Sequence, residues 1–253
     1  MRVSPFDPPP VFRFRNLADF PGVGHAVFTR RGGTSRGPFS SLNLARSVGD
    51  ADDAVTANRE IVAEAMGPGR LRFARQVHGT DVAILNAGTD DPGDPPPVAD
   101  ALATDRPGQW LAILVADCQP ILLHEPDRGV VAAIHSGWRG SVANIVGRTV
   151  RTLAEVFGAD PERIRAGIGP SLGPCCAEFI HYRREIPESL WKYKDEGCHF
   201  DFRRLSRDQL RAEGVADRRI ETMGICTRCR TDLFYSYRAE KTTGRFAAAI
   251  GLR

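Results

Sequence analysis

The sequence predicts a mixed α/β fold in one domain, covering residues 1–253, with largely antiparallel strands. Three observations predict it. Short apolar runs recur along the chain, helical patterns lie between some of them, and two apolar runs are joined by a short Pro/Gly turn. Such a turn is typical of a hairpin and not of a regular strand–helix–strand alternation. With 253 residues, 42% of them hydrophobic, the chain can bury a sizeable core without disulfides.

The first third of the chain is expected to hold strands, one long helix and two loops. Residues 1–14 are rich in Pro and form an extended N-terminal segment. Residues 25–29 predict a short strand, and residues 52–66 predict a helix that begins at Asp and stops at the sequence Gly-Pro-Gly. Strands are expected at 71–77 and 81–85, and the loops at 31–41 and 86–98, the second being a surface loop within the domain.

The middle of the chain is its most apolar part. Residues 110–116, 120–123 and 130–134 each predict a strand, and the five-residue turn 125–129 joins the last two into a hairpin buried on both faces. Residues 141–157 then predict an amphipathic helix that ends at Gly158. Further strands are expected at 164–168, 200–202 and 246–250.

Composition excludes several classes of partner. The formal net charge is only +3, and no run of Lys and Arg indicates nucleic-acid binding. The N-terminus lacks an apolar signal region, and the longest apolar stretch, 110–116, is too short to span a membrane. We therefore expect a cytoplasmic protein whose six cysteines are reduced and serve metal binding, nucleophilic chemistry or core packing. Nothing in the sequence indicates an oligomeric state.

Three potential metal ligands stand at the ends of predicted strands. These are His78, Cys118 and His135, each followed by a turn residue or in a turn-forming context that leaves room for a ligand. Two imidazoles and one thiolate suit Zn²⁺ with an open fourth position, which activates water near neutral pH. Their spacing is unlike that of a zinc finger, so a buried cysteine with two unrelated histidines is the alternative interpretation.

Two Gly- and Arg-rich segments could bind anions. The segment 135–140 (HSGWRG) runs from a buried strand into a helix, where free backbone N–H groups and Arg139 could meet an anion, although a tight turn needs the same glycines. Arg30, in the sequence RRGG at 30–33, is a second candidate. Asn43 could orient a polar ligand, with turn capping as the alternative.

Two other motifs are interpreted as structural. Gly169-Pro170-Ser171-Leu172-Gly173 fits the nucleophile elbow of serine hydrolases, but prolines on both sides of the serine disfavour the strand–turn–helix that the elbow requires. Cys226 and Cys229 form a C-x-x-C pair without a second pair at zinc-ribbon spacing, which predicts a packing role.

The motifs together resemble one known family. The chain is similar to the laccase-domain (YfiH-like) proteins, also called the polyphenol oxidase or purine nucleoside phosphorylase family, from about residue 28 to 251. The resemblance rests on a series of short motifs in a fixed order: FTRRGG at 28–33, SLNL at 41–44, QVHG at 76–79, ADC at 116–118, HSGWRG at 135–140, GIGP at 167–170 and SYR at 236–238.

The resemblance implies a layered α/β/β/α fold and a zinc site made by His78, Cys118 and His135. It also implies an enzyme that uses phosphate to cleave adenosine, inosine and methylthioadenosine, and that deaminates adenosine with water activated at zinc. From the chemistry of these substrates and the positions of the motifs, we assign the binding of phosphate and nucleoside to four further residues: Arg30, Asn43, Arg139 and Arg238.

Other functions remain open at this point. Cys118 could be the nucleophile of a cysteine-type hydrolase, in line with family members linked to the editing of cell-wall precursors. A copper-dependent phenol oxidase is another alternative. A four-copper centre needs roughly ten histidines, largely in H-x-H pairs, whereas this chain has six histidines and no H-x-H, so only a single copper in the same pocket is compatible with it. A metal-binding protein without catalytic activity is the last alternative.

Overall fold

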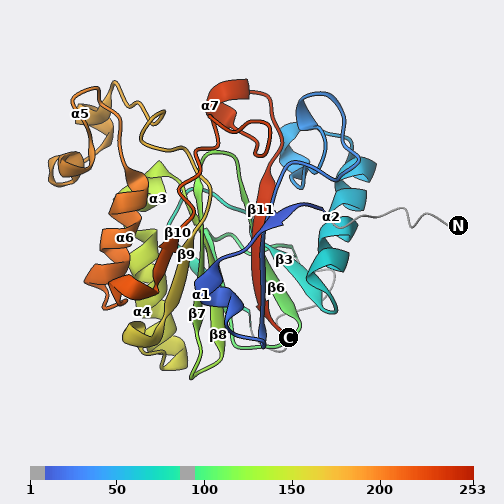
Figure 1. Cartoon of the computed structure of the whole chain (residues 1–253), viewed down its shortest axis with the longest axis horizontal. Helices are drawn as coiled ribbons and strands as arrows, with labels where there is room; N and C mark the ends of the chain where they lie inside the picture. Colours follow the sequence, from blue (N-terminus) through green and yellow to red (C-terminus); the bar gives the residue numbers. More distant parts are fainter. Residues whose placement is uncertain (1–8, 86–94) are drawn as a thin grey trace, which may run out of the picture.

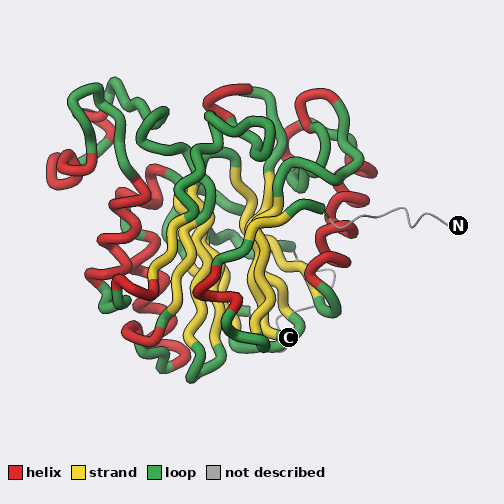
Figure 2. Tube along the Cα trace, viewed as in Figure 1, coloured by secondary structure: helices red, strands yellow, loops and turns green. Residues whose placement is uncertain are grey.

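Two β-sheets lie face to face, and helices cover their outer faces (Figures 1 and 2). This computed structural model describes residues 9–85 and 95–253. One sheet has five strands in the order β1-β2-β11-β6-β3, and the other has six in the order β10-β9-β7-β8-β5-β4. Helix α2 lies on the side of the five-stranded sheet, and α4 and α6 lie on the side of the six-stranded sheet (Figure 1). The expected α/β/β/α layering is confirmed.

The strands are β1 (Val11–Phe12), β2 (Val23–Phe28), β3 (Arg70–Phe73), β4 (Val82–Ile84), β5 (Ala101–Thr104), β6 (Gln109–Val115), β7 (Gln119–Glu125), β8 (Val130–Ser136), β9 (Arg165–Ile168), β10 (Ile220–Thr222) and β11 (Phe246–Leu252). The α-helices are α1 (Arg15–Ala18), α2 (Asp52–Met66), α3 (Trp138–Val142), α4 (Ile145–Phe157), α5 (Tyr182–Glu185), α6 (Phe202–Ala212) and α7 (Tyr237–Glu240). Short 3₁₀ helices are η1 (Gly37–Phe39), η2 (Arg46–Val48), η3 (Pro161–Arg163), η4 (Glu188–Tyr193) and η5 (Asp217–Arg219).

Strand pairing is mainly antiparallel, as predicted. The central strands of both sheets pair antiparallel, including the β7–β8 hairpin in which Ile121 lies opposite Ile134. The three parallel pairs, β3–β6, β4–β5 and β9–β10, each include an edge strand. The sheets are therefore mixed, with parallel pairing confined to their margins.

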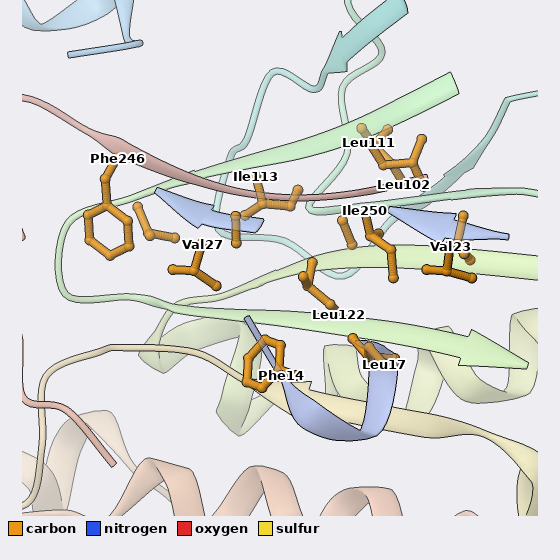
Figure 3. Packing of buried hydrophobic residues seen from close by; sticks show 14 of the residues in the cluster. Phe14, Leu17, Val23, Val27, Leu102, Leu111, Ile113, Leu122, Phe246 and Ile250 are labelled. Atoms are coloured by element: carbon orange, nitrogen blue, oxygen red, sulfur yellow. The ribbon is translucent and has the colours of Figure 1, made fainter. Parts of the chain in front are cut away.

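The apolar runs of the central strands are continuous because both faces of each sheet are covered. In β6, Leu111 and Ile113 face the layer between the sheets, whereas Ala112 packs toward α2. In β7, Leu122 faces the inter-sheet layer and Ile121 packs against the side of α4. Figure 3 shows part of the inter-sheet layer, to which Phe14, Leu17, Val23, Val27, Leu102, Leu111, Ile113, Leu122, Phe246 and Ile250 contribute.

Most predicted elements are present, but three predictions were wrong and one helix was not predicted. The strand expected at 71–77 ends at Phe73. The helix expected at 141–157 is two helices, because Asn144 adopts a left-handed conformation (φ 58°) and its side chain caps α4 by accepting a hydrogen bond from Gly147 N. Residues 200–202 are not a strand. Phe200 makes only an isolated bridge, and Asp201 caps α6, whose existence was not predicted.

Two predicted segments lie partly outside the described residues. Of the extended segment 1–14, residues 1–8 lie outside the described residues, and within the remainder β1 pairs antiparallel with β2. Of the loop 86–98, residues 86–94 lie outside them too, and Val98 bridges to Arg75. Among the described residues, no helix combines the length and apolar composition needed to span a bilayer.

Buried His25 makes stability sensitive to acid. Its Nε2 accepts a hydrogen bond from Phe14 N (2.9 Å), and burial, aided by the charge of Arg13, lowers its pKa from 6.5 to about 4. As the pH falls, His25 of the unfolded chain is therefore protonated before His25 of the folded protein. The free energy of unfolding that is present above pH 6.5 is lost progressively toward pH 4. We expect His25 to account for about 2 kcal/mol of lost stability at about pH 5.

Urea unfolding of wild type and His25→Gln at about pH 7.5 and about pH 5 checks this prediction. Glutamine keeps a hydrogen-bond acceptor but does not titrate, so the difference between the two proteins in their loss of unfolding free energy isolates this imidazole. The prediction is wrong if both proteins lose the same free energy between the two pH values.

Candidate active site

His78, Cys118 and His135 come from three segments that are distant in sequence, and they lie together at one end of the strands. His78 lies between β3 and β4, Cys118 in the turn between β6 and β7, and His135 near the end of β8. Their ligand atoms all lie within 4.8 Å of one another, with Cys118 Sγ 3.9 Å from His78 Nε2. The two imidazole rings meet edge to face, with centroids 4.8 Å apart. This end of the strands is the one at which α3 and α7 lie (Figure 1).

The fully buried carboxylate of Asp100 holds two of these ligands in place. Its Oδ1 accepts hydrogen bonds from His135 Nδ1 (2.7 Å) and His78 N (2.9 Å). Its Oδ2 accepts from Gly79 N (2.7 Å) and Val77 N (3.2 Å). Because Nδ1 of His135 is engaged by Asp100, Nε2 is the ring atom left available to a metal, as in the common carboxylate–histidine–metal arrangement.

A second aspartate shapes the turn that carries Cys118. Asp117 has a left-handed backbone (φ 88°), which is uncommon outside glycine. Its Oδ1 accepts hydrogen bonds from Thr227 Oγ1 and Ser236 Oγ, both 2.7 Å, and its Oδ2 accepts one from Arg238 N (2.6 Å). His78 also has a left-handed backbone (φ 59°). The turns that carry His78 and Cys118 thus each contain a residue with a left-handed backbone, and hydrogen bonds to the carboxylate of Asp100 or Asp117 stabilise them.

The ionisation of the cluster favours a thiolate. Burial raises the pKa of the Cys118 thiol, but the charge of His135 and hydrogen bonds from both histidines outweigh it and bring the pKa to about 6. Burial lowers the pKa of His135, while the Cys118 thiolate and the Asp100 carboxylate raise it to about 9. Burial also raises the pKa of Asp100, but hydrogen bonds from His135 and Gly79 hold it below its usual value.

The cluster fits a zinc ion. Zinc bound tetrahedrally to sulfur at about 2.3 Å and to nitrogen at about 2.0 Å places these ligand atoms about 3.5 Å apart, close to the 3.9 Å between Cys118 Sγ and His78 Nε2. Gly137 provides room for this arrangement. A Cβ at residue 137 would lie 2.8 Å from His78 Cδ2 and 3.1 Å from Cys118 Sγ.

Replacing Gly137 by alanine is therefore expected to weaken zinc binding roughly 10- to 100-fold, the range seen when the groups that orient a ligand are disturbed. The added methyl group must push His78 or Cys118 aside. Competition with a chromophoric chelator measures the affinity. Gly22→Ala is the matched control, because a Cβ there would meet nothing within 4 Å. Equal zinc affinities for the two variants would contradict the prediction.

The three ligands lie in a large pocket of about 1050 Å³. Aromatic side chains line it, namely Phe73, Trp138, Phe179, Phe202 and Tyr237. Basic side chains also line it, namely Arg46, Arg59, Arg75, Arg139, Arg238, Lys241 and Arg245. The pocket therefore presents flat apolar surfaces and positive charge beside the metal cluster, a combination suited to an aromatic ligand with an anionic group.

Of the four predicted substrate-binding residues, Arg139 and Arg238 line this pocket, whereas Arg30 and Asn43 do not. The guanidinium of Arg30 is held by Glu240, the Thr231 carbonyl and the Tyr235 ring. The fully buried Asn43 donates to the Ala45 carbonyl and accepts a hydrogen bond from Arg245 N. The structure thus gives both residues internal partners, and Asn43 contacts a pocket-lining residue through the backbone of Arg245.

Several residues of this pocket were not predicted from the sequence. Asp100 carried no signal, because a lone aspartate before a short strand is common at turns. Asp117 adjoins Cys118, so its proximity could have been noted. The pocket arginines Arg59 and Arg245 were hidden among 31 arginines in the chain. The aromatic side chains of the pocket come from segments far apart in the chain, a separation over which no sequence period extends.

Comparison with known proteins places the chain in a family. The family model described as multi-copper polyphenol oxidoreductase laccase matches residues 24–253. The chain belongs to this laccase-domain (YfiH) family. A relative from Streptomyces coelicolor, named purine nucleoside phosphorylase, is 42% identical over 236 residues, covering 90% of this chain and 95% of the relative. Another with that name, from Deinococcus radiodurans, is 39% identical, covering 96% and 93%.

Solved structures of the laccase-domain family share the fold. The YfiH protein of Bacillus licheniformis superimposes with a TM-score of 0.88 at 31% identity, covering 99% of this chain and 100% of the other. YlmD of Geobacillus stearothermophilus gives a TM-score of 0.84 at 34% identity, covering 95% and 94%. The copper in the family description does not extend to a multicopper centre here, since of the six histidines only His78 and His135 join a metal-ligand cluster within the described residues.

Proposed function

We propose that this protein is a zinc-dependent purine nucleoside phosphorylase that acts on adenosine, inosine and methylthioadenosine and also deaminates adenosine. The observation that carries the proposal is the His78–Cys118–His135 cluster on the wall of a pocket that also presents aromatic and arginine side chains. The name purine nucleoside phosphorylase, which the similar proteins carry, supports the same reaction class.

The pocket offers separate surfaces for the two substrates. A purine ring can stack on Trp138, Phe179 or Tyr237, since aromatic faces bind nucleobases without a strict hydrogen-bond code. Phosphate needs donors arranged for bidentate contact, which arginine supplies. The guanidinium of Arg139 lies over the Trp138 ring, 4.5 Å from its centroid, so a cation and a stacking surface are adjacent. Base and phosphate would thus lie side by side.

The proposed phosphorolysis forms one bond and breaks one. A phosphate oxygen bonds to C1′ of the ribose while the bond from C1′ to N9 of the purine breaks. The electron pair leaves with the base, which takes up the proton that the attacking hydrogen phosphate loses. The second product is ribose 1-phosphate, or methylthioribose 1-phosphate when the substrate is methylthioadenosine. Arg139 and Arg238 would hold the phosphate and balance its charge. Zinc held by His78, Cys118 and His135 would supply Lewis-acid polarisation. In deamination, water adds at C6 of adenosine and ammonia leaves.

The deciding experiment is an assay on full-length protein with its metal content measured. Adenosine, inosine and methylthioadenosine are each supplied with and without inorganic phosphate, and the products are separated by chromatography. Free base and a ribose 1-phosphate that appear only with phosphate support the phosphorylase, and inosine from adenosine without phosphate supports deamination. A zinc-loaded protein that leaves all three nucleosides unchanged contradicts the proposal.

Replacing Arg139 by glutamine is expected to raise the KM for phosphate about tenfold or more, because one charge-assisted hydrogen bond contributes about 1.5–3 kcal/mol. Zinc content and the KM for nucleoside should change little. Arg183→Gln is the matched control, since Arg183 is also exposed and lies over a tyrosine ring, but it does not line the pocket. A KM for phosphate equal to that of the control would remove Arg139 from the phosphate site.

The same geometry also favours a second candidate, a cysteine-type hydrolase of the kind that would edit cell-wall precursors. Its basis is the Cys118 thiol, with a pKa of about 6, beside a His135 that is oriented by Asp100, as in a Cys–His–Asp nucleophilic arrangement. The two functions use one sulfur in opposite ways. Alkylation of Cys118, followed by peptide mapping with and without chelator, separates them: a zinc-bound thiolate reacts only after chelation, whereas a free nucleophile reacts at once.

A further inference from the structure

Four other cysteines form a second cluster outside the pocket. Cys175 and Cys176 lie in the turn that follows β9, and Cys226 and Cys229 lie in the loop that follows β10. All four sulfur atoms lie within 4.8 Å of one another. The C-x-x-C pair predicted to have a packing role thus does have a second pair, supplied by two adjacent cysteines about 50 residues earlier.

The sulfur–sulfur distances match a metal–thiolate site. Cys229 Sγ lies 3.5 Å from Cys176 Sγ and 3.7 Å from Cys175 Sγ. A disulfide bond would bring two sulfurs to about 2.05 Å. Four thiolates around zinc at about 2.3 Å place neighbouring sulfurs about 3.8 Å apart. The cluster therefore has the dimensions of a tetrahedral site in which four sulfurs surround one metal ion.

The surroundings of Cys226 suit a thiolate that binds metal. Its Sγ accepts a hydrogen bond from Gly173 N (3.3 Å), and a second from the Cys229 backbone N–H. Such N–H donors orient thiolates and offset their charge. A Cβ at Gly173 would lie 3.1 Å from Cys226 Cβ and 3.2 Å from a terminal nitrogen of Arg203. The Arg203 guanidinium therefore lies near the cluster, where it would compensate the net negative charge of zinc with four thiolates.

We propose that Cys175, Cys176, Cys226 and Cys229 bind a second, structural zinc ion. Thiolate ligands in a tetrahedral set favour zinc among the common divalent ions. With four protein ligands the site leaves no position for substrate, so its role is to join two loops. One loop continues to Phe179 in the pocket wall. The other contains Thr227, which hydrogen-bonds to Asp117 beside Cys118. The second zinc would thereby brace the active-site pocket.

Metal analysis of the full-length protein, purified with excess Zn²⁺ and then desalted, tests the proposal. We expect about two zinc ions per chain in wild type and about one in Cys118→Ala, which leaves only the four-cysteine site. Adding Cys226→Ser or Cys229→Ser to Cys118→Ala should remove the remaining zinc. Cys198→Ser is the matched control, because Cys198 belongs to neither cluster. Cobalt-loaded Cys118→Ala should show the intense visible and thiolate charge-transfer absorption of tetrahedral cobalt with four sulfurs.

Three results would overturn the proposal. The first is Cys118→Ala that holds no zinc and shows no thiolate–cobalt absorption. The second is a native disulfide between the two loops, found by peptide mapping of protein prepared without reductant. The third is alkylation of the four cysteines in zinc-loaded protein as rapid as after chelation. Because all of these readouts concern metal and thiols, they are independent of whether the protein turns over nucleosides. Should Cys226→Ser fail to fold, the exposed Cys229 and the cobalt spectrum still decide the outcome.

Discussion

Replacing Cys118 by alanine is expected to abolish phosphorolysis and deamination, with a loss of at least roughly a thousandfold in kcat/KM. Disturbing only the groups that orient a zinc ligand costs up to about 100-fold, and this variant removes a ligand itself. Two imidazoles remain, His78 and His135, and these hold zinc far more weakly than three ligands do. The fold should persist, because Cys118 is only partly buried and the Asp117 hydrogen bonds are kept.

The measurement is kcat/KM for adenosine with and without phosphate, together with zinc content and the midpoint of thermal unfolding. Cys198→Ala serves as the control, since it removes an equally partly buried sulfur away from the pocket. If Cys118→Ala lost zinc but kept wild-type turnover, the cluster would not be catalytic. If it lost activity but kept zinc at the pocket, the nucleophilic role of Cys118 would be favoured.

Asp100→Asn is expected to give the second largest effect, lowering zinc affinity about 100-fold and stability by about 3 kcal/mol. The carboxylate of Asp100 accepts four hydrogen bonds, two on each oxygen. Asparagine replaces one acceptor oxygen by an NH₂ group, which then faces two N–H donors. Either His78 N and His135 Nδ1 or the two backbone donors on the other oxygen lose their acceptor inside the protein, so both the ligand geometry and the turn at His78 are disturbed.

Zinc affinity by chelator competition and unfolding free energy by urea titration check this prediction. Asp81→Asn is the matched control: Asp81 directly precedes the edge strand β4, but its side chain is 70% exposed and pairs with Arg148 at the surface. We expect this control to change stability by less than about 1 kcal/mol. Wild-type zinc affinity and stability in Asp100→Asn would show that the carboxylate does not assemble the site.

The secondary structure could be predicted where local chemistry decides it. The helix expected at 52–66 coincides with α2, because an acidic start and the Gly-Pro-Gly stop act within one turn of chain. The hairpin of β7 and β8 follows from two apolar runs and the turn between them. The break at Asn144 was not predicted, because apolar residues recur with helical spacing throughout 141–157. The break depends on the backbone conformation of a single residue, Asn144, which periodicity does not reveal.

The three residues predicted from the sequence to bind metal form one cluster in the structure, and metal binding itself stays a prediction. The sequence places His78, Cys118 and His135 after predicted apolar strands. In the structure β3 already ends at Phe73, Cys118 lies in the turn after β6, and His135 is the second-last residue of β8. Their convergence is seen only in the structure, which brings the three ligand atoms within 4.8 Å. Of the four residues predicted to bind substrate, only Arg139 and Arg238 line the pocket, because a motif locates a backbone segment but does not fix the direction of a long side chain. Arg30 turns to Thr231 and Glu240, about 200 residues away in sequence.

By itself, the sequence determined the α/β class, the apolar strands and the family, because these depend on periodicity, turn residues and short motifs that act over a few positions. Only the tertiary structure decided which side chains share a site. Asp100 reaches His78 and His135 across 22 and 35 residues, and the paired cysteines meet across 53 and 54 residues. Such contacts depend on how the two sheets and their loops pack, and packing is a property of the whole chain that no local pattern records.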